Sequence, residues 1–201
     1  FTISGSLMIL YQYLPILLLN AFFTSYEVGL FSVSYRIIIT FCRTGFLIMV
    51  AVYPILSDLY KKNRYKFMRI QKNFFKFMLI AGFFFGILET IFSNKIITIL
   101  LTNKYQESVP IFKIMIWLLP IYFIRYVFGP SLQAVGLQKF HSISTLLGLI
   151  SMLVIGILSV YFFSSIGAAI SVLFSELIVV SSMVYFWEKN KNCTNKESKN
   201  E

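Results

Sequence analysis

The chain has 201 residues, of which 58% are hydrophobic and only 13% are charged. Soluble domains contain about 45–50% apolar and about 25% charged residues, so the composition excludes an ordinary soluble domain and indicates a protein embedded in lipid. The net charge of +10 does not indicate nucleic-acid binding, because the basic residues cluster between apolar runs and not on a polar folded face.

Six continuous apolar stretches are each long enough to cross about 30 Å of hydrocarbon as a helix of about 20 residues. Because the runs are continuous and do not alternate, they favour helices over a membrane barrel. The sequence therefore predicts an all-α membrane protein with one six-helix region over 1–187 and a basic, disordered tail over 188–201. The expected spans are 3–24, 32–57, 74–93, 111–133, 142–163 and 168–187.

The first expected span carries polar residues and a helix breaker. Gln12 and Asn20 are eight residues apart and lie near one face, and Pro15 should bend the helix between them. These three residues are candidates for a cavity wall or a gate. Helix-to-helix packing is the alternative interpretation.

The second expected span contains Arg36 and Arg43, seven residues apart and so on one helix face. Charge inside a membrane is costly and usually faces a cavity or a partner. Because a guanidinium matches phosphate and carboxylate groups, both arginines are candidate binding residues for an anionic substrate. For Arg36, near the outer end, extension of the side chain to the interface is the alternative.

Seven basic residues fall between Asp58 and Lys76, after the second apolar run. Basic residues beside spans resist translocation, so the segment 58–73 predicts a cytoplasmic loop. Its interspersed apolar residues suggest an interfacial helix, with segment 58–76 attracted to anionic lipids. The next short apolar run, 96–101, is expected to lie in the outer interface.

Charges also occur in the fourth and sixth expected spans. Arg125, with Gln133 on a similar face, lies between Pro120 and Pro130, which predict a kinked helix. Arg125 is a candidate substrate-binding residue and Gln133 a cavity candidate. Glu176 could form a structural ion pair with Arg125 or Arg43, or it could bind a coupling ion.

The predicted topology places twelve Lys and Arg residues on one side of the membrane and three on the other. This bias predicts that both ends of the segment are cytoplasmic. The two cysteines have no pairing or metal-ligand spacing, and His141 is expected in a solvated loop. The sequence predicts no metal, cofactor or catalytic group, and hence no enzyme.

Five segments, taken in order, resemble the oligosaccharide flippases of the multidrug/oligosaccharidyl-lipid/polysaccharide exporter superfamily. They are 27–36, 52–60, 97–108, 132–139 and 166–170. The resemblance implies one lobe, the C-terminal half, of a two-lobe alternating-access transporter in the bacterial cytoplasmic membrane, with the N-terminal lobe missing from this chain. One departure is the stretch 102–105, which stands where many relatives have a glycine before Tyr105.

The cargo implied by the resemblance is an undecaprenyl-pyrophosphate-linked oligosaccharide, the repeat unit of an O-antigen, capsule or other surface polysaccharide. Two alternatives remain open at this point. One is a multidrug exporter of the same superfamily, although the arginines disfavour cationic cargo. The other is a membrane-embedded polysaccharide polymerase or ligase, which would normally carry a large external loop with catalytic residues.

Overall fold

The protein is described by a computed structural model, which covers residues 2–101 and 103–197. The chain is helical throughout these ranges, with no strand among them. In order it forms α1 (Thr2–Phe22), α2 (Ser25–Lys62), α3 (Arg64–Leu101), η1 (Asn103–Ser108), α4 (Val109–Met115), α5 (Leu118–Ala134) and α6 (Gln138–Glu197). The expected all-α architecture is confirmed.

Three of these helices, α2, α3 and α6 over Gln138–Asn190, are long and apolar enough to cross a membrane. A fourth span results if the bent pair formed by Tyr105–Met115 and Leu118–Ala134 is counted as one. Large apolar side chains such as Leu47, Ile80 and Phe162 are more than 60% exposed. An apolar exterior of this kind suits contact with lipid, so the fold is compatible with a multi-pass membrane protein.

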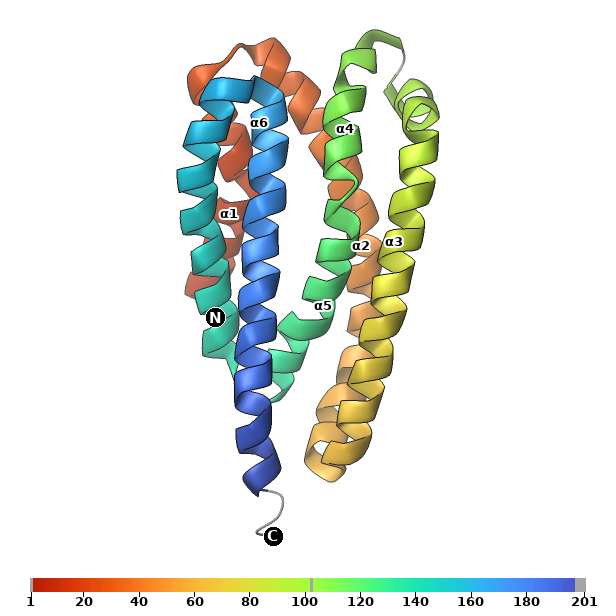
Figure 1. The fold of residues 1–201 in the computed structure, drawn as a ribbon, viewed down its shortest axis with the longest axis vertical. Coiled ribbons are helices and arrows are strands. Elements are labelled where there is room, and N and C mark those ends of the chain that lie inside the picture. The colour runs from red at the N-terminus through yellow and green to blue at the C-terminus, as the bar shows by residue number, and fades with distance from the viewer. Residues whose placement is uncertain (1, 102, 198–201) are drawn as a thin grey trace.

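Helix α6 consists of two arms that meet at Ser164, whose φ of 55° and ψ of −132° are non-helical. Figure 1 shows the arms side by side, the first rising and the second descending. Ser159 stabilises the turn, since its Oγ donates to Gly167 O at 3.0 Å. The fifth and sixth expected spans therefore fall on the two arms of this hairpin.

The basic segment is helical, as its interspersed apolar residues suggested, but it is the end of α2 and the start of α3 and not the separate loop expected over 58–73. Helix α2 continues to Lys62 and α3 begins at Arg64, so Asn63 alone joins them. The Asn63 N–H donates to Leu59 O at 2.8 Å, and its Oδ1 accepts from the Lys66 N–H at 2.9 Å. Asn63 thus ends one helix and caps the next. Each 38-residue helix is about 57 Å long, so its ends extend beyond a hydrocarbon layer of about 30 Å.

Two other expectations are also corrected. Residues 96–101 are the last turns of α3 and not a separate interfacial helix. Helix α6 continues to Glu197, so most of the tail expected to be disordered is helical, and residues 198–201 lie outside the described ranges. In both places the sequence contains no glycine or proline that would end the helix.

The kink predicted in the fourth span is present, with α4 and α5 bent by 44°. It lies just before Pro120, which has no N–H to donate and whose ring disfavours a straight helix there. Pro130 lies within α5. Helix α5 ends in a Schellman motif: Gly136 has φ +80°, and the Leu137 N–H donates to Leu132 O at 2.8 Å. This short turn brings the start of α6 back alongside α5.

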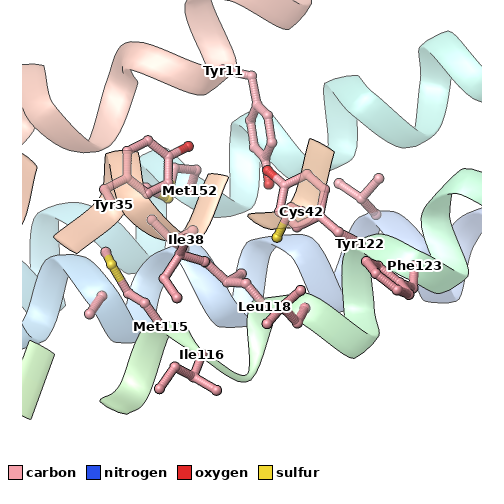
Figure 2. Close-up of a cluster of buried hydrophobic side chains, with 14 of the residues drawn as sticks. Tyr11, Tyr35, Ile38, Cys42, Met115, Ile116, Leu118, Tyr122, Phe123 and Met152 are labelled. Atoms are coloured by element: carbon pink, nitrogen blue, oxygen red, sulfur yellow. The ribbon is translucent and has the colours of Figure 1, made fainter. Parts of the chain in front are cut away.

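The core lies where α5 and the second arm of α6 meet α1, α2 and α3. Figure 2 shows side chains from several helices converging there, including Tyr11, Tyr35, Cys42 and Tyr122. Cys42 is buried and unpaired. Hydroxyl and apolar groups thus share one interior, and the candidate site lies in this part of the fold.

Candidate functional site

Among the residues whose burial the structure describes, the most buried charges form an ion pair between α5 and the second arm of α6. The Arg125 Nη1 atom lies 2.7 Å from both carboxylate oxygens of Glu176. Arg125 is 4% exposed and Glu176 is fully buried. A buried guanidinium and carboxylate are each stabilised by the other, so removing either one leaves an uncompensated buried charge.

Aromatic side chains surround this pair. The Arg125 guanidinium carbon lies 5.8 Å from the Tyr11 ring centre and 5.7 Å from that of Tyr122, within cation–π distance. The Tyr11 hydroxyl donates to Ser175 Oγ at 3.0 Å, which connects α1 to α6. The Arg125 Nη2 atom has no hydrogen-bond partner among the described residues. Arg125 therefore retains an unused donor.

A cavity of about 350 Å³ lies beside the pair, between α1, α2 and α5 and the first turn of α6. Arg125 contributes to its wall, whereas Glu176 is not among the lining residues. The polar and aromatic lining comes from Tyr11, Gln12, Arg43, Phe46, Tyr122, Arg125, Tyr126, Gln133 and His141. The cavity thus contains two guanidinium groups and two amides.

A second cavity of about 290 Å³ adjoins the first and shares Gln12, Ile39 and Arg43 with it. Arg36 and Thr40 add to its wall, and Thr40 Oγ1 donates to Arg36 O at 2.8 Å. We call the two cavities together the cationic groove. No carboxylate lines either cavity among the residues that the structure describes, so the groove carries net positive charge.

The eight residues singled out in the sequence are distributed as follows. Arg36, Arg43, Arg125, Gln12 and Gln133 all line the cationic groove. The other three lie outside its lining: Pro15 is buried within α1, Asn20 is exposed near the end of α1, and Glu176 lies behind Arg125.

His141 and Tyr126 also line the groove but were not among the candidates. His141 was expected in a solvated loop, yet it is half-buried in the first turn of α6, where a Cβ added at Gly129 would meet its ring at 3.2 Å. No local pattern reveals this, because the position depends on the tight turn at Gly136. Tyr126 directly follows Arg125, and this adjacency is the only feature of the sequence that could have indicated a place for Tyr126 in the groove.

No group of three or more His, Cys, Asp or Glu residues that could hold a metal is found in ranges 2–101 and 103–197. Comparison of the chain with protein-family models, with curated proteins and with solved structures finds no match.

Proposed function

We propose that this chain is one lobe of a two-lobe flippase that carries an undecaprenyl-pyrophosphate-linked oligosaccharide across the bacterial cytoplasmic membrane. The observation that carries the proposal is the cationic groove, where Arg36 and Arg43 are exposed and no described carboxylate is present. A pyrophosphate presents oxygen atoms that guanidinium groups bind with short, charge-assisted hydrogen bonds.

The distribution of basic residues supports the proposed topology, with six spans and both ends of the segment in the cytoplasm. In Figure 1 the junction of α2 and α3, the turn between α5 and α6 and the end of α6 all lie toward the lower end of the bundle. These are the segments that the charge bias assigns to the cytoplasm. The groove residues would then bind cargo from the inner leaflet, and opposite-facing states would alternate through rocking of the two lobes.

The double variant R36A/R43A in the complete transporter tests this function. Because each hydrogen bond to a charged group contributes about 1.5–3 kcal/mol, we expect at least a tenfold loss of lipid-linked oligosaccharide transfer. The measurement is the transfer of this substrate between leaflets of proteoliposomes, at matched protein content. R36K/R43K should retain more activity than the alanine variant, since lysine keeps the positive charge although it lacks the planar guanidinium.

The matched control is K95A/K113A, which removes two exposed cations that line neither cavity of the groove. Transfer should be unchanged in this variant. Equal transfer by R36A/R43A and the unaltered protein would contradict the proposal. A gain in export of cationic drugs by R36A/R43A would instead favour the multidrug alternative, and altered polymer length with normal transfer would favour a polymerase or ligase.

A further inference from the structure

A larger cavity, of about 990 Å³, lies outside the cationic groove at the basic end of the bundle. It is bounded by the first turns of α3, by α5 and by the second arm of α6. Its lining combines apolar and aromatic side chains, among them Phe75, Phe128 and Trp187, with Arg69, Gln71 and Lys72. None of its lining residues belongs to the groove lining, so the cavity is a separate feature.

The wall of this cavity is apolar and aromatic. The Phe75 and Phe128 rings are 5.5 Å apart in an edge-to-face arrangement, and Trp187 lies 6.4 Å from Phe128. Phe128 and Trp187 are both more than 90% buried. A concave apolar surface of this volume is suited to a hydrocarbon chain.

The rim carries two cations on α3. Arg69 and Lys72 are exposed and three residues apart, so they project from neighbouring positions of one helix face. Neither takes part in an ion pair with another described side chain. Glu188 of α6 also lines the cavity, but the two cations outnumber it.

Gln71, between these cations in the sequence, is a buried residue whose side-chain amide nitrogen has no partner within the described ranges. It is 5% exposed, and its Nε2 has no hydrogen-bond acceptor among the described residues although it lines the cavity. Buried donors are nearly always satisfied. The unpaired amide therefore leaves a hydrogen-bond donor available for an acceptor from outside the chain.

We propose that this cavity binds one acidic glycerophospholipid of the surrounding membrane. Arg69 and Lys72 contact its phosphate, the Gln71 amide donates to a phosphate or ester oxygen, and an acyl chain lies against Phe75, Phe128 and Trp187. Basic pockets between membrane helices are a recurrent form of lipid headgroup site. The sequence predicted only a diffuse attraction of segment 58–76 to anionic lipid, and the cavity narrows this to a defined site. The proposal does not depend on the transported cargo.

Trp187 provides a direct probe, because the chain contains only one other tryptophan, Trp117. The complete protein is prepared with W117F and with any tryptophan outside this chain replaced by phenylalanine, so that Trp187 alone fluoresces. It is reconstituted in bilayers that contain phosphatidylglycerol or phosphatidylcholine brominated on one acyl chain. We expect brominated phosphatidylglycerol to quench Trp187 fluorescence at much lower mole fractions than brominated phosphatidylcholine. In R69Q/K72Q this preference should fall about 25-fold, the product of about fivefold for each charge.

The matched control is K66Q/K76Q, which removes two exposed cations from the same helix that do not line the cavity. This variant should keep the preference, and so should the charge-conserving R69K/K72R. Equal quenching by the two lipids, or an equal loss in R69Q/K72Q and K66Q/K76Q, would overturn the site. Displacement of brominated phosphatidylglycerol by undecaprenyl pyrophosphate, but not by unbrominated phosphatidylglycerol, would identify a cargo site and also overturn it.

Discussion

Glu176→Ala should lower the free energy of unfolding by about 3–5 kcal/mol, the cost of leaving one partner of a buried ion pair uncompensated. The large effect is expected because Arg125 is 4% exposed and both of its contacts at 2.7 Å are with Glu176. The remaining guanidinium would keep its contacts with the Tyr11 and Tyr122 rings but would lose its carboxylate partner. Denaturant-induced unfolding of the purified protein in detergent measures the change.

The double variant R125M/E176L distinguishes a charge penalty from a packing defect. It removes both charges while keeping apolar volume, so its stability should lie within about 1–2 kcal/mol of the original protein. A double variant as unstable as Glu176→Ala would show that the pair is not the source of the loss. A stable R125M/E176L protein that no longer transfers cargo would assign the pair a role in transport as well.

Gly82→Ala should cost about 2–3 kcal/mol, toward the upper end of the range for overpacking a close contact. A Cβ at Gly82 would lie 2.7 Å from Pro120 Cα, and because this is a backbone atom no change of side-chain rotamer can relieve the contact. Gly82 begins the Gly-x-x-x-Gly pattern of α3, and this spacing permits close approach of helices. The same unfolding experiment provides the measurement.

Gly86→Ala is the internal comparison for this prediction. Its nearest neighbour would be Ile116 Cγ2 at 3.8 Å, an ordinary contact. Alanine also has a higher helix propensity than glycine by about 1 kcal/mol, so this variant should be neutral or more stable. Equal destabilisation by the two substitutions would show that α3 and α5 are not packed as closely as described.

The helical architecture was predictable because long apolar runs leave few other structures in lipid. The ends of the helices were not. Charged and polar residues at 58–76, 94–95 and 188–197 resemble loops, yet no glycine or proline interrupts them. The structure is helical through these residues, with Asn63 as the one break. Polarity indicates where a helix leaves the hydrocarbon, and not where its hydrogen-bonding pattern stops.

The candidate site was predictable to a different extent for each residue. Arg36 and Arg43 share a helix, so the helical period alone places them on one face. The partner of Glu176 could not be chosen from the sequence, because Arg125 lies 51 residues away and Arg43 was an equal alternative. Only the packing of α5 against α6 selects the pair. The unpaired amide of Gln71 could not be predicted from the sequence either, since whether a buried donor finds an acceptor depends on how the helices pack.

The single-residue junction at Asn63 has a mechanical consequence. Only one residue separates helices α2 and α3, so we expect a tilt of α2 that carries Arg36 and Arg43 to move the turns of α3 that bear Arg69 and Lys72 as well. With cargo in the groove and phospholipid in the cavity, as proposed, the binding of each would alter the affinity for the other, because thermodynamic coupling is reciprocal. The acidic lipid content of the membrane should accordingly set how readily the groove is loaded.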